Sequence, residues 1–295
     1  MSLSFEELSF EKLPHPVLEP EEEGFDSKNV YNPAVIKYRK KFVMLYRAEG
    51  KNDEVTGRIG LAISEDGVNF IRHPEPVLEP EYPWERIGVE DPRVVRVKGT
   101  YYMTYTGYDG RTARLCLATS KNLLNWKKLG PVFPEFPFKR NGIENWTKSG
   151  AILSERIRDG RFKGHYIMYF GDSNVWLALS KNLREWEYVA EPVIRPEGTL
   201  VEAGAPPLLT NDGILMFYND ADDDLVYRVR AALFDPEDPR RILRRSDYLL
   251  EPTFEWEREG WVPNVVFAES YADGLLYYGA ADRRVGVTKL RGKSL

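Results

Sequence analysis

A tyrosine-rich apolar strand pattern recurs five times, and this repeat constrains the fold more than any other feature of the sequence. The copies read FVMLYRA, YYMTYTG, YIMYFGD, ILMFYND and LLYYGAAD, with anchor residues Tyr46, Tyr105, Tyr169, Tyr218 and Tyr278. Each copy follows a run that starts polar and becomes apolar. A strand-rich repeat of about 50 to 65 residues is typical of a propeller with one four-stranded blade per repeat. The sequence therefore predicts an all-β fold, a five-bladed β-propeller.

The ends of the chain indicate how such a ring closes. The last repeat stops at RRVGVTKL, before the proline segment that follows the hairpins of the earlier repeats. That segment, PVLEP, occurs at residues 76–80 and again at residues 16–20, ahead of the first repeat. We expect the N-terminal segment to supply the missing outer strand of the last blade, which removes an open sheet edge. No linker or low-complexity tract interrupts the pattern, so residues 1–295 are predicted to form one catalytic domain.

Charge and composition exclude several classes of function. The net charge of −5 argues against a nucleic-acid binder, and no apolar stretch is long enough for a membrane span. The N-terminus lacks a secretory signal pattern, and the single cysteine, Cys116, fits the cytoplasm. The three histidines have no metal-ligand spacing, and no nucleotide-binding motif is present. We therefore expect neither a metal nor a cofactor, and no feature selects an oligomeric state.

Polar residues at the inner ends of the strands mark the candidate site. The innermost strand of each blade starts at the central funnel, where buried polar groups are either hydrogen-bonded or functional. The candidates at these starts are Asn32, Glu90, Asp91, Arg93, Lys148, Glu202 and Asn264. The ends of the second strands add Arg47, Asp172, Asn219, Asp220 and Asp282. Carboxylates, amides and a few cations, with aromatic rings nearby, suit the binding of sugar hydroxyls. An oligosaccharide is the expected substrate.

Asp91 and Glu202 are the leading pair for acid–base chemistry. Each lies at the start of an innermost strand, flanked by proline or glycine. Inverting glycosidases place two carboxylates about 6.5–9.5 Å apart, so that a water or another nucleophile fits between them. The alternative is that both acids only cap backbone amides at tight strand starts. The sequence pattern alone leaves both interpretations open.

The motif set resembles glycoside hydrolase family 130. The motifs GVEDPRV, YYMTYTGY, GAPPLLTNDGILMFYN, ALFDPEDPRRILRRS, VPNVVF and YYGAAD run in family order over nearly the whole chain. The resemblance implies a five-bladed propeller acting on β-mannosides, either as an inverting phosphorylase or as a hydrolase. It also implies that Asp91 is the general acid, in some members acting through a substrate hydroxyl. Arg93 belongs to the same motif, and Arg47, Lys148 and Asp282 fall on positions that face the sugar.

Two departures from the family pattern favour hydrolysis. The family's phosphorylases tend to carry a histidine where this chain has Asn219, and an arginine where it has Gly171. Both residues resemble phosphate ligands, and phosphate recognition needs cations or oriented donors. Glu202 is then the expected base that activates water, with Glu257 and Glu259 as alternates. Arg47, Lys148 and Arg93 keep a phosphate site possible.

Three functions follow from the sequence. The main prediction is an inverting β-mannosidase that uses Asp91 as acid and Glu202 as base. The alternative is a phosphorylase that uses inorganic phosphate as co-substrate and releases mannose 1-phosphate. The third is a propeller that binds glycans without turning them over.

Overall fold

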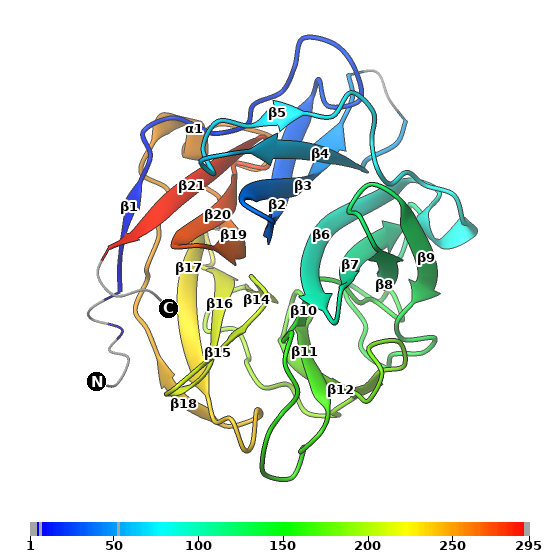
Figure 1. Cartoon of the computed structure of the whole chain (residues 1–295), viewed down its shortest axis with the longest axis vertical. Coiled ribbons are helices and arrows are strands. Elements are labelled where there is room, and N and C mark those ends of the chain that lie inside the picture. The colour runs from blue at the N-terminus through cyan, green and yellow to red at the C-terminus, as the bar shows by residue number, and fades with distance from the viewer. Residues whose placement is uncertain (1–4, 6–7, 52–53, 292–295) are drawn as a thin grey trace.

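Five antiparallel sheets surround a central axis in the computed structural model, which describes residues 5, 8–51 and 54–291 (Figure 1). The first blade comprises β2 (Asn29–Tyr38), β3 (Lys41–Glu49), β4 (Arg58–Ser64) and β5 (Ile71–Arg72). The second comprises β6 (Gly88–Val97), β7 (Thr100–Tyr108), β8 (Ala113–Ser120) and β9 (Trp126–Pro131). The third comprises β10 (Ala151–Ile152), β11 (Tyr166–Phe170), β12 (Trp176–Ser180) and β13 (Glu187–Tyr188). The predicted five-bladed propeller is confirmed.

The fourth and fifth blades vary this plan. The fourth comprises β14 (Leu200–Ala203), β15 (Leu208–Thr210), β16 (Gly213–Ala221), β17 (Tyr227–Phe234) and β18 (Ile242–Arg245). Both β14 and β15 pair with β16, so the innermost strand is interrupted where two consecutive prolines provide no N–H donors. The fifth comprises β19 (Val266–Ala272), β20 (Leu275–Ala280), β21 (Arg284–Arg291) and β1 (Ser9–Lys12).

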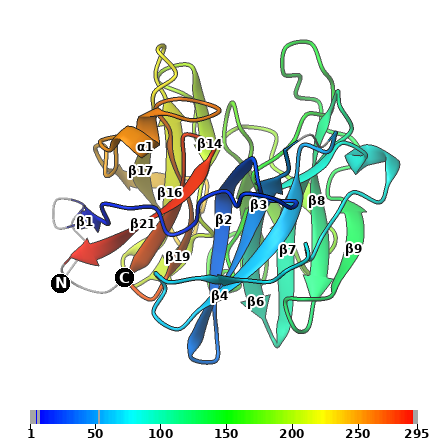
Figure 2. The same ribbon diagram turned by 90° about the horizontal axis from the view of Figure 1, so that it is seen from above.

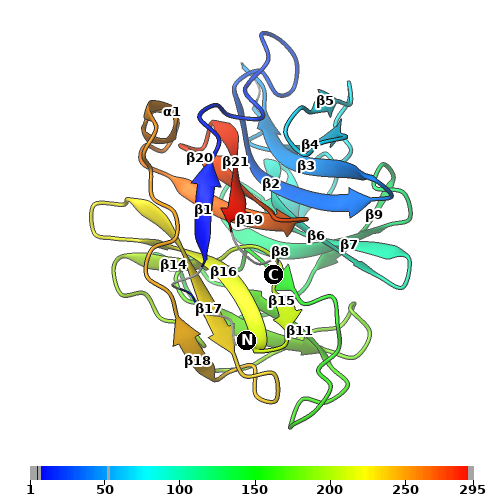
Figure 3. The ribbon, with the colours of Figure 1, turned by 60° about the vertical axis from the view of Figure 1, so that its left-hand side comes forward.

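The N-terminal segment closes the ring, as the sequence predicts. Strand β1 pairs antiparallel with β21, and the two strands lie side by side in Figure 2 and Figure 3. The regular outer strands, however, precede the proline segments that were expected to form them. The segment at residues 16–20 contributes one bridge, Leu18 to Val285, and the segment at residues 76–80 contributes one bridge, Leu78 to Ile59. Prolines at both ends of these segments provide no N–H donors, so the pairing there stays short.

Apolar side chains fill the spaces between neighbouring blades rather than one central core. The described residues contain five buried clusters, one for each blade-to-blade contact around the ring. The alternating pattern of each strand places one face against the preceding blade and the other against the following blade. No helix among the described residues is long and apolar enough to cross a membrane.

Three of the anchor tyrosines form the same contact in different blades. Each tyrosine hydroxyl donates to a carboxylate that precedes the innermost strand, and a cation on the outermost strand pairs with that carboxylate. We call these the acid–tyrosine–cation triads: Asp26–Tyr46–Arg72, Glu85–Tyr105–Lys128 and Glu257–Tyr278–Lys12. In the last triad the cation comes from β1, so the closing strand completes the polar network of the fifth blade.

Candidate active site

A cavity of about 130 Å³ lies on the propeller axis, at the end where the innermost strands begin. All five blades contribute to its wall, and Figure 1 shows their innermost strands converging on the centre of the ring. The lining residues are Tyr31, Asn32, Arg47, Asp91, Arg140, Lys148, Glu202, Tyr227, Val262, Val265, Phe267 and Asp282. Six of the sequence candidates are among them, so the predicted starts of the innermost strands do converge.

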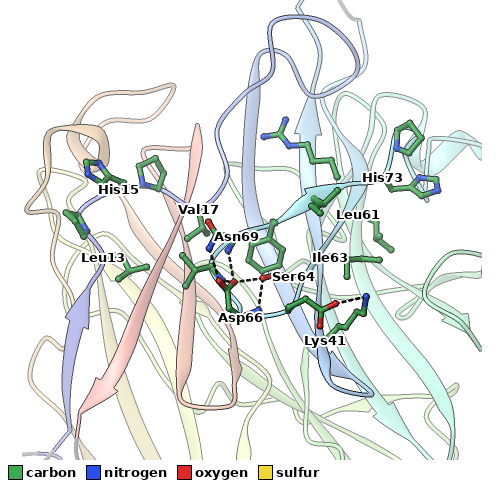
Figure 4. A pocket seen from close by; sticks show the side chains of 18 residues that line it. Leu13, His15, Val17, Lys41, Leu61, Ile63, Ser64, Asp66, Asn69 and His73 are labelled. Carbon is green, nitrogen blue, oxygen red and sulfur yellow. Dashed lines mark hydrogen bonds and ion pairs between the residues drawn. The ribbon is translucent and has the colours of Figure 1, made fainter.

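A larger cavity, of about 960 Å³, lies away from this chemistry. It is a groove between residues 13–17 and the β4–β5 hairpin, and it shares no lining residue with the axial cavity (Figure 4). Its carboxylate Asp66 accepts backbone hydrogen bonds from Val68 and Asn69 and thereby stabilises the hairpin turn. Because the groove gathers no cluster of charged side chains from several blades, we place the active site on the axis.

Backbone bulges aim two of the polar side chains into the axial cavity. Asn32 and Asp91 both have φ of 50°, and the strand register shifts at each of them. Each precedes a proline, which provides no ladder N–H and allows the pairing to break there. Left-handed backbone at a non-glycine residue costs about 1–3 kcal/mol, and such strain concentrates at functional sites. The strained EDPR turn therefore supports a role for Asp91 beyond capping.

Asp91 is held between two cations. Its Oδ2 lies 2.9 Å from Lys148 Nζ, and its Oδ1 lies 3.4 Å from an Arg47 guanidinium nitrogen. Burial alone would raise the pKa of Asp91, but Lys148 and Arg47 outweigh burial and hold that pKa well below its ordinary value. Asp91 is thus ionised in the free protein. An anion bound to the same cations would compensate their charge, raise the pKa of Asp91 and prepare it to donate a proton.

Lys148 links Asp91 to the second carboxylate, Glu202. The Lys148 ammonium lies 3.8 Å from Glu202 Oε1, and the Ser149 hydroxyl donates to the same oxygen. Ser149 has φ of 57°, another left-handed residue at a strand start. The acidic neighbours outweigh the effect of burial and raise the pKa of Lys148, which keeps its ammonium charged. One cation therefore lies between the two predicted catalytic carboxylates.

Arg47 is oriented by acids on its own side of the cavity. Its guanidinium lies 3.1 Å from both Glu49 and Glu90 and donates to the carbonyl of Thr56 at 2.9 Å. Burial raises the pKa of Glu90, against the opposing effect of Arg47. Glu90 was predicted to bind substrate, but the structure places it behind Arg47 and outside the cavity lining. From there it can orient Arg47, which does line the cavity.

Asp282 lines the cavity on the side of the fifth blade. It follows Ala281, and both residues have left-handed backbone, with φ of 46° and 49°. Burial raises the pKa of Asp282 to about 7, although Arg47 and Lys148 oppose this shift. A carboxyl group that titrates near neutral pH can donate or accept a hydrogen bond, which suits a sugar hydroxyl.

Four other predicted substrate-binding residues lie outside the cavity lining. Arg93 is buried, donates to the carbonyls of Gly204 and Ala203, and pairs with Glu269 at 3.1 Å. Asn219 has both amide atoms bonded to the Ala268 backbone. These two residues connect strands below the cavity instead of facing substrate.

Asp172 and Asn264 flank the cavity. The Asp172 carboxylate accepts a hydrogen bond from Trp146 Nε1 at 2.9 Å and pairs with Arg140. It therefore holds Arg140, whose side chain lines the cavity. Asn264 offers its backbone carbonyl to the Tyr227 N–H.

Neither of the alternate bases, Glu257 and Glu259, lines the axial cavity. Glu257 lies in α1 (Glu255–Arg258), fully buried, and accepts hydrogen bonds from Tyr278, Lys12 and the N–H of Phe254. Glu259 lies exposed just beyond that helix. The sequence pattern FEWEREG did not reveal that the first acid stabilises the end of a blade, and that expectation is corrected.

Several cavity residues were missed by the sequence analysis. Arg140 comes from the loop between β9 and β10, where no periodicity indicates which side chain reaches the axis. Its guanidinium lies 5.3 Å from the Trp146 ring and pairs with Asp172. Tyr31 precedes the first bulge, and its hydroxyl donates to Glu49 at 2.5 Å. Among the residues that the structure describes, no group of three His, Cys, Asp or Glu side chains is arranged to hold a metal.

Comparison with known proteins supports one family. Residues 11–294 match the family described as β-1,4-mannooligosaccharide phosphorylase. The chain is 38% identical to a 1,2-β-oligomannan phosphorylase of Thermoanaerobacter sp. (strain X514), over 95% of this chain and 96% of that one. It is 36% identical to a β-1,2-mannobiose phosphorylase of the same organism, over 92% and 93% of the two chains.

Solved structures agree with this result. A putative glycoside hydrolase from Parabacteroides distasonis has a TM-score of 0.87 and 30% identity, covering 98% of this chain and 97% of that chain. A second structure comes from work on family members that are glycoside hydrolases targeting β-1,2 mannosidic linkages in Candida mannan. It has a TM-score of 0.85 and 30% identity, covering 95% and 93% of the two chains. The resemblance noted in the motifs is confirmed: the chain belongs to glycoside hydrolase family 130, an enzyme family of mannoside phosphorylases and related glycosidases.

Proposed function

We propose that this enzyme is an inverting β-1,2-mannoside phosphorylase that releases α-mannose 1-phosphate. The observation that carries the proposal is the set of three cations, Arg47, Arg140 and Lys148, that line one small axial cavity beside Asp91. Guanidinium and ammonium groups are the preferred protein ligands of phosphate. The 38% and 36% identical relatives, matched over nearly their whole length, are both phosphorylases of β-1,2-linked mannosides.

This proposal replaces hydrolysis as the preferred function. The hydrolase expectation depended on Asn219 and Gly171, which stand where phosphorylases tend to carry cationic residues. Asn219 lies outside the cavity lining, so its identity gives no direct measure of phosphate binding. Gly171 has φ of 116°, and a Cβ there would lie 2.2 Å from the carbonyl oxygen of Asn174. Arg140 brings a guanidinium to the cavity from the loop instead, and Asp172, the residue after Gly171, holds it.

In the proposed reaction, phosphate attacks one side of the mannosyl C1 and Asp91 protonates the oxygen that leaves on the other side. Phosphate, held by the cations, attacks C1 of the mannosyl residue from the α face while the β-linked C1–O bond breaks. A new C1–O–P bond forms, and the configuration inverts. Asp91 delivers a proton to the leaving oxygen, directly or through a substrate hydroxyl. The proton lost by the attacking phosphate restores Asp91, so the protons balance over the cycle. Glu202 and Asp282 orient the sugar hydroxyls.

Hydrolysis is the second candidate, and one observation favours it. Glu202 faces the cavity across Lys148 from Asp91, where a carboxylate could activate water. In that case the cations would serve mainly to orient the two acids.

The dependence of rate on phosphate distinguishes the two candidates. Initial consumption of β-1,2-mannobiose is measured as inorganic phosphate is titrated from none to excess, with β-1,4-mannobiose as the parallel substrate. A phosphorylase shows no turnover without phosphate and a saturating rise with it. An undiminished rate without phosphate would support the hydrolase, and glycan binding without turnover would support the non-catalytic propeller.

A further inference from the structure

A second cavity adjoins the active site on the same face of the propeller. It has a volume of about 550 Å³ and includes Trp261 and several charged side chains. Three chain segments contribute neighbouring residues to both cavities: 29–32 at the start of β2, 261–262 before β19, and 282–283 after β20. Because the same segments form both walls, a molecule that leaves the axial cavity in this direction meets the second cavity first.

The size of the axial cavity requires such an extension for any longer substrate. Its volume of about 130 Å³ lies well below the ~300 Å³ at which ordinary small-molecule pockets begin, so it cannot enclose a whole oligosaccharide. An oligosaccharide with its terminal residue in this cavity must place its remaining residues outside it. The second cavity is about four times larger and is open to solvent.

Trp261 indicates which class of ligand the second cavity binds. It is 65% exposed, although large aromatic side chains are usually covered, and it belongs to none of the buried clusters of the described residues. Lys28 Nζ lies 4.9 Å from the centroid of the ring and also pairs with Glu49 at 3.6 Å. An exposed aromatic ring held in place at the rim of a sugar cavity is suited to stack on the apolar face of a pyranose.

The charges around Trp261 favour a neutral polar ligand over an ion. Lys28, Lys51 and Arg283 line the cavity together with Glu21 and Glu22, so both signs are present. A phosphate-rich polymer would need a surface of one positive sign. Interspersed donors and acceptors match hydroxyl groups, each of which can both donate and accept.

We propose that the Trp261 cavity binds the second and later sugar residues on the leaving-group side of the cleaved bond. It thereby makes the enzyme favour β-mannooligosaccharides longer than a disaccharide. This inference rests on the proposed function, because it requires the terminal mannose to occupy the axial cavity. To the proposed function it adds a preference for longer substrates and names Trp261 as the residue responsible for that preference.

The test compares substrates of different length in Trp261→Ala. Values of kcat/KM are measured for β-1,2-linked mannobiose, mannotriose and mannotetraose with saturating phosphate. We expect kcat/KM for mannotriose and mannotetraose to fall about 2- to 12-fold, the usual range for one aromatic contact, and kcat/KM for mannobiose to stay nearly unchanged. Trp261→Phe, which keeps a ring, should recover most of the loss. Ile71→Ala is the matched control, since Ile71 is 80% exposed on β5 in the remote groove.

Three results would overturn the inference. An equal loss for all three lengths would mean that Trp261 acts on the axial cavity or on the first leaving-group residue, which every substrate has, and not on the later residues. No loss for any length would mean that the ring contacts no sugar. A change in molecular mass of Trp261→Ala by light scattering would assign the ring to a contact between copies of the chain. Absence of phosphate-dependent turnover in the unmodified enzyme is a separate result, which contradicts the proposed function and not the length preference.

Discussion

The chain places carboxylates beside cations in two regions, with different consequences. In the acid–tyrosine–cation triads each carboxylate is buried and fully partnered. Glu85, for example, accepts from Tyr105, Lys128 and two backbone N–H groups. In the axial cavity, Asp91, Glu202 and Asp282 share Lys148 and Arg47 and face an open volume. The same residue types thus stabilise blade ends in one region and leave binding capacity in the other.

The difference shows that a carboxylate–cation pair by itself does not identify an active site. The axial residues differ from the triads in three ways. They converge from all five blades, three of them (Asn32, Asp91 and Asp282) have left-handed backbone, and one cation, Lys148, lies beside both Asp91 and Glu202. The triads have instead a local, repeated geometry within one blade. Substitutions in the two regions should therefore separate activity from stability.

The largest expected effect is on catalysis. Asp91→Asn removes the proton donor, so kcat should fall by about 10²–10⁴-fold, the usual contribution of a positioned general acid. Its circular dichroism spectrum should match that of the unmodified enzyme. The comparison variant, Glu85→Gln in a triad, should lower the melting temperature while the folded fraction keeps its kcat. If Asp91→Asn kept kcat within tenfold of the unmodified enzyme, Asp91 would not be the general acid.

The next effect is on stability and tests the closure of the ring. Lys12→Met leaves Glu257 buried without its cation, in a pair whose side chains are 10% and 0% exposed. Breaking such a pair should cost about 3–5 kcal/mol in the free energy of unfolding, measured by urea denaturation. Lys41→Met is the control, since its pair with Glu65 is exposed and should contribute only about 0–1 kcal/mol. Equal effects in the two variants would show that β1 does not complete the fifth blade.

A smaller effect is expected for phosphate binding. Arg140→Ala removes one guanidinium from the cavity, and a hydrogen bond to a charged group contributes about 1.5–3 kcal/mol. The KM for phosphate should therefore rise by at least about tenfold. The melting temperature should fall as well, because the Asp172 side chain is 2% exposed and keeps only its hydrogen bond from Trp146. Steady-state kinetics at varied phosphate measure this directly. An unchanged KM for phosphate would assign Arg140 to the loop rather than to the anion.

The smallest effect concerns pH. Burial raises the pKa of Asp282 to about 7 from an ordinary 3.8, so the folded protein binds this proton more tightly than the unfolded chain. The resulting stabilisation is complete below the ordinary value and is lost as the pH rises through about 7. Between these values the free energy of unfolding should fall by up to about 1.4 kcal/mol per pH unit.

Asp282→Asn should flatten this slope. Urea denaturation at several pH values between about 5 and 8 gives the comparison. Glu269, whose pKa burial raises to about 8, contributes a slope of the same sign, so Asp282→Asn with Glu269→Gln should be flatter still. An unaltered slope in both variants would show that neither carboxyl is held neutral by the fold.

The sequence predicted the ring, the closing segment and much of the cavity because these depend on local repeats. Asp91 and Glu202 stand at strand starts, which the turn from polar to apolar residues reveals. Arg140 could not be predicted, because a loop without periodicity gives no indication of where its side chains reach. Glu257 was wrongly predicted as an alternate base because its role depends on a contact between the two ends of the chain. Its role depends on Lys12, which lies 245 residues away in sequence and contacts it only when the ring closes.

The most direct test of phosphorolysis is the identity of the first product. The reaction of β-1,2-mannobiose with phosphate is followed by ³¹P and ¹H NMR, which resolve the anomeric configuration before mutarotation. Phosphorolysis with inversion predicts one equivalent of α-mannose 1-phosphate for each mannobiose consumed, with one equivalent of mannose from the leaving group. Two equivalents of free mannose and an unchanged phosphate signal would contradict it and identify a hydrolase.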